Sequence, residues 1–253
     1  MTFSLFLAFS AFIIALVGTR LLILAFRNNS LLLDRPNARS NHHAPVPRGG
    51  GLAVVFAIII PMLVADIELY MVLSILILAS VSLLDDLISL PPWLRLMVQV
   101  IAVAIPLAFM PVHFADDIIP SVTQKILIGI VWIWFINLYN FMDGIDGITA
   151  AETISIGMTV ALVMVFIEQF PSVLASYSMI IGAAACGFWW WNRHPARIFL
   201  GDVGSIPLGF ITFYLLLLLA QQGHYVAALI IPSYYLLDSG ITLFKRLLRR
   251  QKI

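Results

Sequence analysis

The sequence has few charged residues for its length. Only 11% of its 253 residues are Asp, Glu, Lys or Arg, whereas 62% are hydrophobic and the mean hydropathy is +1.03. A soluble domain of this length could bury a large core, but it would also need a charged exterior that this composition cannot supply. The apolar residues must therefore face lipid as well as one another, which is typical of a multi-pass membrane protein.

Other absences narrow the class of protein further. A formal net charge of +1 gives no reason to expect a nucleic-acid partner. The single cysteine, Cys186, excludes an intrachain disulfide and lies in an apolar run, where we expect it to pack. There is no internal repeat, low-complexity tract or interdomain linker, so residues 1–253 are predicted to form one domain.

Apolar segments long enough to cross a membrane fill most of the chain. The first, from Thr2 to Phe26, lacks the basic start and the cleavage pattern of a signal peptide, so we expect it to remain as a helix. Such segments lie near residues 3–26, 50–65, 69–85, 94–110, 122–139, 149–167, 173–191, 206–221 and 225–244. The predicted fold class is all-α, a polytopic membrane helix bundle of about nine transmembrane helices.

The charges between these segments alternate in sign along the chain. Acidic residues such as Asp66, Glu68 and Glu168 fall on one side of the implied topology. The basic residues on the other side are Arg27, Arg35, Arg39, Arg48, Arg95, Arg193, Arg197, Lys245, Arg246, Arg249, Arg250 and Lys252. Because cytoplasmic loops are enriched in Arg and Lys, we expect this side to be the cytoplasm, with the N-terminus outside and the C-terminus inside. All the polar motifs lie on this side too.

A ladder of polar side chains follows the apolar segment near residues 122–139. It is written N-L-Y-N-F-M-D-G-I-D-G and contains Asn137, Asn140, Asp143 and Asp146. Steps of three residues on a helix rotate by roughly 300°, so these side chains could converge on one bound ion or phosphate. A polar loop with glycines for turning is the alternative. The full pattern is far more specific than a lone D-G, and we interpret it as functional.

Asp85 and Asp86 close another apolar segment. An acidic pair at a helix end can simply be solvated at the membrane interface. Adjacent carboxylates repel one another, however, and a helix C-terminus is the less favourable end for an anion, so something should compensate their charge. We therefore interpret this pair as functional as well.

Asp202 lies between two glycines in the motif F-L-G-D-V-G-S, directly before a further apolar segment. Ser205 would suit the N-cap of that helix. Phe199 is an aromatic residue that could stack on a base, and Arg193 and Arg197 could hold phosphates. Since Mg²⁺ prefers one or two carboxylates plus substrate phosphates, Asp202 and the ladder could supply its ligands.

The first polar loop, from Asp34 to Gly51, carries Arg35, Arg39 and Arg48 and ends in three consecutive glycines. This composition suits anion binding by guanidinium groups and exposed backbone amides. An ordinary loop that obeys the positive-inside rule explains the arginines equally well.

Together the motifs offer acidic groups, an amide pair, arginines and an aromatic ring at one membrane face, without a nucleophilic cysteine or serine pattern. This set fits metal-assisted phosphoryl transfer on a nucleotide-linked substrate, with a lipid as the second substrate. A transporter with a carboxylate relay is the rival class. Transporters place such groups near the bilayer midplane, whereas these cluster at helix ends.

The motifs resemble those of the polyprenyl-phosphate N-acetylhexosamine-1-phosphate transferases, a glycosyltransferase family of bacterial cell-envelope synthesis. They occur in family order from about residue 34 to about residue 210. The matching stretches are Asp34-x-Pro36 with Arg39, Pro47-Arg48-Gly49-Gly50, Asp85-Asp86, the ladder, and Phe199-Leu200-Gly201-Asp202-x-Gly204-Ser205. The loop D-R-P-N-A-R-S-N-H-H looks most like the branch that initiates O-antigen (lipopolysaccharide) synthesis.

The resemblance implies transfer of an N-acetylhexosamine 1-phosphate from a UDP-sugar to undecaprenyl phosphate, with release of UMP. The site would face the cytoplasm at a bacterial inner membrane, in contact with membrane lipid, and a second copy of the chain would be a further partner. Mg²⁺, or Mn²⁺ in its place, would rest on Asp202 and Asn140. Whether attack is direct or passes through an aspartyl-phosphate stays open.

Roles for individual residues follow from the same resemblance. The expected catalytic residues are Asp85, Asp86, Asp143 and Asp146, of which Asp85 or Asp86 would activate or orient the lipid phosphate. The residues expected to bind substrate are Arg39, Arg48, Asn137, Asn140, Arg193, Arg197 and Phe199, with Phe199 stacked on uracil. Family members also carry a late histidine motif and at least one further helix, neither of which appears before Ile253. A truncated and inactive relative is therefore an alternative expectation.

Overall fold

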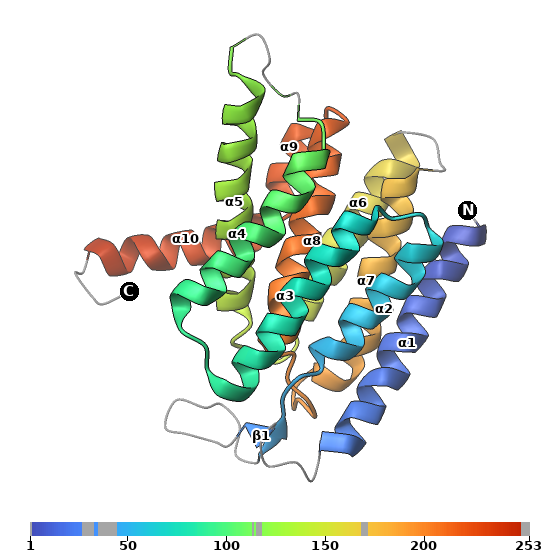
Figure 1. Cartoon of the computed structure of the whole chain (residues 1–253). Coiled ribbons are helices and arrows are strands. Elements are labelled where there is room, and N and C mark those ends of the chain that lie inside the picture. The colour runs from blue at the N-terminus through green and yellow to red at the C-terminus, as the bar shows by residue number, and fades with distance from the viewer. Residues whose placement is uncertain are drawn as a thin grey trace.

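A computed structural model describes residues 2–26, 33–34, 45–112, 114, 118–167 and 172–248 of the chain. Its helices are α1 (Thr2–Phe26), α2 (Gly51–Val64), α3 (Leu69–Ile88), α4 (Pro92–Phe109), α5 (Ser121–Met142), α6 (Ile148–Ile167), α7 (Val173–Asn192), α8 (Asp202–Gln221), α9 (Tyr225–Ile230) and α10 (Ser233–Leu248). Two short strands, β1 (Leu33–Asp34) and β2 (Val46–Pro47), pair antiparallel below the bundle (Figure 1). The expected all-α membrane bundle is confirmed.

Within the described residues, seven helices are long and apolar enough to cross a membrane, namely α1, α3, α4, α5, α6, α7 and α8. Helix α2 has 14 residues, about 21 Å, and is shorter than a full span. The segment 225–244, expected to be one helix, breaks into α9 and α10 around Pro232, and α10 projects away from the bundle (Figure 1). Which end of the bundle faces the cytoplasm stays a prediction.

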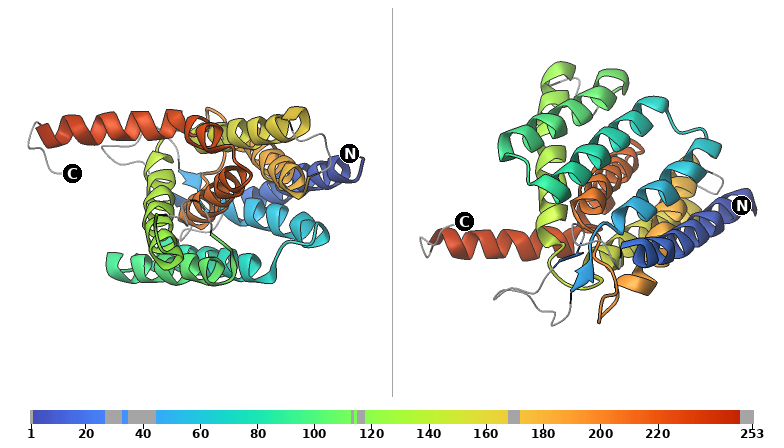
Figure 2. Two further views of the ribbon diagram at one scale, coloured as in Figure 1. Left: turned by 90° about the horizontal axis from the view of Figure 1, so that it is seen from above. Right: turned by 60° about the horizontal axis from the view of Figure 1, so that its bottom comes forward.

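Helix α8 is the centre of the bundle. The other helices surround it when the bundle is viewed along its length (Figure 2), and α8 contacts α2, α3, α5, α6, α7 and α9. Trp132 of α5 is fully buried, stacks on Phe210 of α8 at 4.9 Å between ring centroids, and donates its indole N–H to the Phe210 carbonyl at 2.9 Å. These contacts fix α8, and with it the polar motif at its N-terminus.

The starts of α2 and α8 touch backbone to backbone. Gly51 begins α2 and Gly204 lies in the first turn of α8. A Cβ atom on Gly51 would lie 2.2 Å from the Cα atom of Gly204, and one on Gly204 would lie 2.6 Å from the Cα atom of Gly51. Only a residue without a side chain fits here, which explains the last glycine of the first polar loop.

This contact predicts a large difference between two Gly-to-Ala variants. We expect Gly51→Ala to lower the free energy of unfolding by about 1–3 kcal/mol, because the new methyl group forces α2 and α8 apart. Gly240→Ala in α10 meets nothing within 4 Å and removes a helix-weakening residue, so it should be neutral or stabilising. Thermal unfolding of the purified protein in detergent measures both, and equal stability of the two variants would contradict this packing.

Candidate functional site

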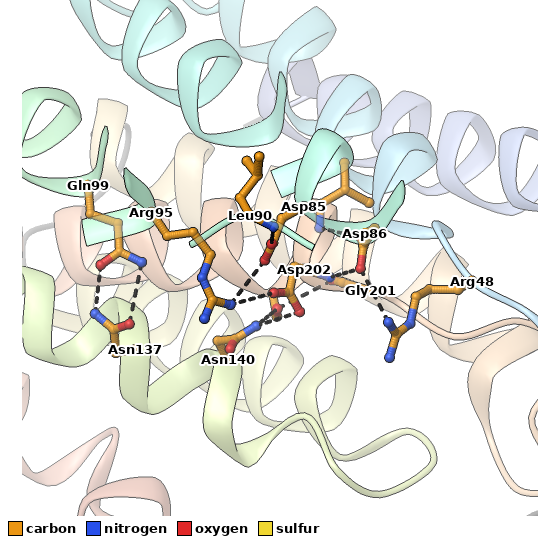
Figure 3. Close-up of polar contacts among 12 residues, drawn as sticks. Arg48, Asp85, Asp86, Leu90, Arg95, Gln99, Asn137, Asn140, Gly201 and Asp202 are labelled. Carbon is orange, nitrogen blue, oxygen red and sulfur yellow. Dashed lines mark hydrogen bonds and ion pairs between the residues drawn. The ribbon is translucent and has the colours of Figure 1, made fainter. Parts of the chain in front are cut away.

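Three helix ends meet at the lower end of the bundle in Figure 1. Asp85 and Asp86 come from the last turns of α3, Asn140 comes from the last turn of α5, and Asp202 is the first residue of α8. Figure 3 shows these side chains facing one another across the gap between the three helix ends. The structure thus brings together residues from three separate sequence motifs.

Asp86 caps the N-terminus of α8. Its carboxylate accepts hydrogen bonds from the backbone N–H groups of Asp202 (3.3 Å) and Val203 (3.1 Å), and Arg48 Nη1 lies 3.6 Å from Asp86 Oδ1 (Figure 3). Only 2% of the Asp86 side chain is exposed. The positive end of a helix dipole and a guanidinium group therefore partly compensate this buried charge, as we expected for an acidic pair at a helix C-terminus.

Asp85 turns to a different partner. Its Oδ1 accepts a hydrogen bond from the Leu90 N–H at 2.6 Å, and its Oδ2 accepts one from Arg95 Nη1 at 3.0 Å. The same Nη1 atom lies 3.8 Å from Asp202 Oδ2. Arg95 therefore links the carboxylates of α3 and α8, and the repulsion expected between Asp85 and Asp86 is relieved by separate cations.

Asp202 is the most exposed of these three carboxylates, with 26% of its side chain accessible. Its Oδ1 accepts a hydrogen bond from Asn140 Nδ2 at 3.0 Å, and the same amide nitrogen lies 2.8 Å from the hydroxyl oxygen of Ser205. Gly201 is the N-cap of α8, so Ser205, expected in that place, instead lies in the first turn. Asp202 is thus oriented by the protein and open to a ligand.

The other members of the ladder diverge from Asn140. Asn137 exchanges amide hydrogen bonds with Gln99 of α4, at 2.7 Å and 3.4 Å. Asp146 accepts hydrogen bonds from Ala196 N at 3.1 Å and pairs with His194 Nδ1 at 2.9 Å. The ladder therefore does not converge on one point, because its side chains contact three different neighbours.

Asp143 is the C-cap residue of α5. Burial raises its pKa to about 7, and the negative charge of Asp202 acts in the same direction. The Thr149 hydroxyl opposes this rise by hydrogen bonding to the carboxylate. Thr149 in turn accepts a hydrogen bond from the buried Tyr235 hydroxyl of α10 at 3.1 Å. A chain of hydroxyl groups thus supports Asp143 from inside the bundle.

The glycine run pairs with the segment before α8. Gly49 and Gly50 donate their N–H groups to the Phe199 carbonyl at 3.2 Å and 2.9 Å, and Gly51 donates to the Leu200 carbonyl at 2.9 Å. Phe199 N–H donates to the Pro47 carbonyl at 2.8 Å. These amides are not free, so the expectation that they bind an anion is wrong. They instead fix Arg48 and Phe199 beside the acidic cluster.

The remaining arginines of the predicted site lie in other surroundings. Arg193 covers the Trp190 ring at 4.2 Å, and Arg197 lies 5.5 Å from the centre of the Trp191 ring. Neither has an ion pair with a carboxylate among the residues that the structure describes. Arg39 lies outside the described residues.

Three contributors were not predicted. The sequence analysis assigns Arg95 only to the positive-inside charge. It is the single charged residue of the apolar segment that forms α4, and Gln99 follows it on the same helix face. Asn192 is buried, accepts a hydrogen bond from Gly147 N at 3.0 Å and donates one to the Ile198 carbonyl at 2.9 Å. Asn192 thereby ties the loop after α5 to the loop before α8. A lone charge in an apolar helix was the available signal for Arg95.

The charges of the cluster do not cancel. Asp85, Asp86 and Asp202 face Arg48 and Arg95, so the fully ionised cluster has one more negative than positive charge. Among the described residues there is no group of three His, Cys, Asp or Glu side chains that could hold a metal unaided. Mg²⁺ does not need such a group, since it keeps waters and takes substrate phosphates beside one or two carboxylates. The partly exposed Asp202 and its amide neighbour Asn140 fit that requirement.

Comparisons with known proteins agree with this picture. Residues 68–220 match the family model of glycosyl transferase family 4. The chain is 29% identical over 238 residues to a probable undecaprenyl-phosphate N-acetylglucosaminyl 1-phosphate transferase of Bacillus subtilis, covering 87% of this chain and 66% of that protein. It is 26% identical over 229 residues to a phospho-N-acetylmuramoyl-pentapeptide-transferase of Caldicellulosiruptor bescii, covering 81% and 70%. The chain therefore spans about two thirds of the length of these curated relatives.

The capping role of Asp86 predicts an effect on stability. Asp86→Ala leaves the first amides of α8 and the Arg48 guanidinium without their partner, and should lower the free energy of unfolding by about 1–3 kcal/mol. Glu68→Ala is the matched control, because Glu68 precedes α3 and its side chain caps nothing. Thermal unfolding in detergent compares the two variants, and equal melting temperatures would contradict the role given to Asp86.

Proposed function

The chain belongs to glycosyl transferase family 4, and from this premise we propose that it transfers an N-acetylhexosamine 1-phosphate from a UDP-sugar to undecaprenyl phosphate. The products would be UMP and the lipid-linked diphospho-sugar with which O-antigen or cell-wall polymer synthesis begins. The name of the Bacillus subtilis relative supports this acceptor and this transferred group.

One observation carries the proposal. Asp202 is partly exposed at the N-terminus of α8. The ion pairs Arg48–Asp86 and Arg95–Asp85 lie beside it. A phosphoryl-transfer site needs both cations to hold anionic substrates and carboxylates to place a divalent ion. These groups lie at the ends of α3, α5 and α8, so the site opens toward the water phase, where a nucleotide sugar can reach it.

The reaction is a displacement at phosphorus. An oxygen of the lipid phosphate attacks the phosphorus that bears the sugar and forms a new diphosphate bond. The bond from that phosphorus to the oxygen of UMP breaks, and UMP leaves with the electron pair. We propose direct attack, because Asp85 and Asp86 are 8% and 2% exposed and already accept hydrogen bonds, which leaves them poorly placed as nucleophiles.

Each residue near the cluster then has a role. Arg48 and Arg95 would hold substrate phosphates while remaining paired with Asp86 and Asp85. Asp85 and Asp86 would position these guanidinium groups, and Asp143 would lie against the substrate near Asp202.

The other predicted residues act around this centre. Asn137 and Asp146 would position α4 and the loop before α8, as their hydrogen bonds indicate. Phe199 would stack on the base of the nucleotide. Arg39, Arg193 and Arg197 would attract the anionic donor toward this end of the bundle.

The proposed reaction requires a divalent cation. Asp202 and Asn140 would hold Mg²⁺, or Mn²⁺ in its place, and the bound ion would neutralise the diphosphate and stabilise the departing UMP. The uncompensated negative charge of the cluster supports such an ion. We place the site on the cytoplasmic side of a bacterial inner membrane, where nucleotide sugars are made.

A carboxylate-based transporter is the weaker candidate. Its carboxylates would have to lie along a path through the bilayer, near the middle of the spans. Those of this cluster lie at helix termini, and Asp86 is fully engaged in capping α8.

Release of UMP tests the proposed activity. Purified protein given undecaprenyl phosphate, Mg²⁺ and a panel of UDP-N-acetylhexosamines should release UMP with at least one donor. Asp202→Asn, which keeps size and polarity but removes the charge, should lower kcat by about 100-fold or more. Asp66→Asn, an exposed acid between α2 and α3, should leave it unchanged. Absence of UMP release with every donor, from protein shown to be folded, would overturn the proposal.

Removal of divalent ions is a second test. EDTA should abolish turnover, and Mg²⁺ or Mn²⁺ should restore it, because neither guanidinium group carries the divalent charge that the ion would supply. Full activity in excess EDTA would contradict the role given to Asp202 and Asn140.

Arg95 provides a test that the structure alone suggested. Arg95→Gln removes the cation shared by Asp85 and Asp202, and should lower kcat/KM by about 100-fold, chiefly through a higher KM for the lipid phosphate. Lys125→Gln removes a charge from the first part of α5, at the far end of that helix, and should have no effect. A change in kcat alone would mean that Arg95 does not bind the acceptor.

A further inference from the structure

An amide pair joins α4 to α5 about one helical turn from the acidic cluster. Asn137 Nδ2 donates a hydrogen bond to Gln99 Oε1 at 2.7 Å, and Gln99 Nε2 donates one to Asn137 Oδ1 at 3.4 Å (Figure 3). Asn137 Nδ2 also donates to the Ile133 carbonyl at 2.8 Å. Both hydrogens of the Asn137 amide are therefore engaged within the protein.

The amide pair lies on the same helix faces as the residues that meet at Asp202. Gln99 follows Arg95 by four residues on α4, and Asn140 follows Asn137 by three residues on α5. Residues at these spacings are neighbours on a helix surface. Arg95 Nη1 lies 3.8 Å from Asp202 Oδ2, and Asn140 donates to Asp202 Oδ1 at 3.0 Å. The two helices are thus connected twice, once through Asp202 and once through the amide pair.

Apolar packing of α4 ends at Gln99 on the side of the site. The buried residues of α4 all come from its later part and are Gln99, Ala102, Val103, Pro106 and Leu107. Leu96 and Met97, which follow Arg95, are about half exposed. Between α3 and α4 a cavity of about 10 Å³, the space of about one water molecule, adjoins Arg95 and Gln99. Polar contacts, more than packing, therefore position Arg95.

The Arg95 side chain has one close partner, and 38% of it is exposed. Asp85 accepts its hydrogen bond at 3.0 Å, which attaches it to α3. A long side chain held at one point loses entropy when it is fixed in a single geometry, so the backbone that carries it must be well placed. Gln99 is only 3% exposed, and its buried carboxamide has to keep a partner. The amide pair therefore fixes the position of α4 against α5.

We propose that Gln99 is a positioning residue for the acceptor phosphate. It acts through Asn137 to hold α4 against α5, and this keeps the Arg95 guanidinium where the phosphate of undecaprenyl phosphate binds. The inference rests on the role that the proposed function gives to Arg95. The alternative is an interhelical contact that only stabilises the bundle, since amide side chains join many transmembrane helices. The two differ in whether the loss of Gln99 weakens binding of the phosphate.

Binding of the lipid in the absence of a donor separates these alternatives. Tryptophan fluorescence of the purified protein in detergent gives the dissociation constants of undecaprenyl phosphate and of undecaprenol, which lacks the phosphate. The wild-type protein should bind undecaprenyl phosphate more tightly. Gln99→Leu keeps the size of the side chain but removes both hydrogen bonds. It should weaken binding of undecaprenyl phosphate about tenfold, as expected for one interhelical hydrogen bond, and leave binding of undecaprenol unchanged.

Gln124→Leu is the matched control. Gln124 is also a buried glutamine, and it hydrogen bonds to the Phe114 N–H and the Ile119 carbonyl near the far end of α5. Its loss should lower the melting temperature about as much as Gln99→Leu does, while undecaprenyl phosphate still binds as it does to the wild type.

An exchange of the two amides tests the pair itself. Gln99→Asn combined with Asn137→Gln keeps both carboxamides and the summed length of the two side chains. This double variant should bind undecaprenyl phosphate within about threefold of the wild type, and more tightly than Gln99→Asn alone.

A second double variant tests whether Gln99 acts through Arg95. Arg95→Gln combined with Gln99→Leu should bind undecaprenyl phosphate no more weakly than Arg95→Gln alone, because the positioned cation is already absent. Additive losses, or binding by Gln99→Leu equal to that of the wild type, would overturn the inference and leave the proposed function standing. If the wild-type protein binds undecaprenol and undecaprenyl phosphate equally tightly, the role given to Arg95 is wrong and the inference falls with it.

Discussion

The candidate site depends on one buried carboxylate at the start of the central helix. Asp86 accepts two amide hydrogen bonds from α8 while it pairs with Arg48, so three parts of the chain meet at one side chain. An unpaired carboxylate this deeply buried would cost several kcal/mol, and the helix dipole with the guanidinium group offsets that cost. Because α8 is packed on nearly all sides, its N-terminus cannot shift to follow a ligand, and Asp202 is held in place before any substrate arrives.

The same geometry explains why two adjacent carboxylates can lie together in an apolar helix. Consecutive residues on a helix point about 100° apart, so Asp85 faces Arg95 of α4 while Asp86 faces Arg48 and α8. Arg95 also lies close to Asp202. The side chain of Arg48 is 44% exposed, so it can also contact a ligand. The pair is thus not a single functional unit. It positions Arg48 and Arg95 near the partly exposed Asp202, and anionic substrates require cations in such positions.

The sequence predicted the membrane bundle and the motifs that build the acidic cluster, because apolar segments and rare intramembrane charges are local signals. It did not predict how the ladder divides. Regular spacing on one helix suggested that the side chains converge. In the structure Asn137 pairs with Gln99, Asn140 pairs with Asp202, and Asp146 pairs with His194, each on a different helix or loop. The predicted anion site at the glycine run was wrong for a similar reason. The carbonyls of Phe199 and Leu200, which accept hydrogen bonds from its amides, are far away in sequence. Such hydrogen-bond partners are set by the tertiary structure and leave no local signal in the sequence.

The loop before α8 is held at both of its ends. Trp191 anchors its beginning on α1, Asn192 holds Ile198, and the Phe199 carbonyl receives the amides of the glycine run. Arg197 extends from this loop toward the Trp191 ring, and Asp202 follows at its end. Since that segment is hydrogen bonded at both ends, the backbone that carries Asp202 is held from the α1 side as well as from the glycine run.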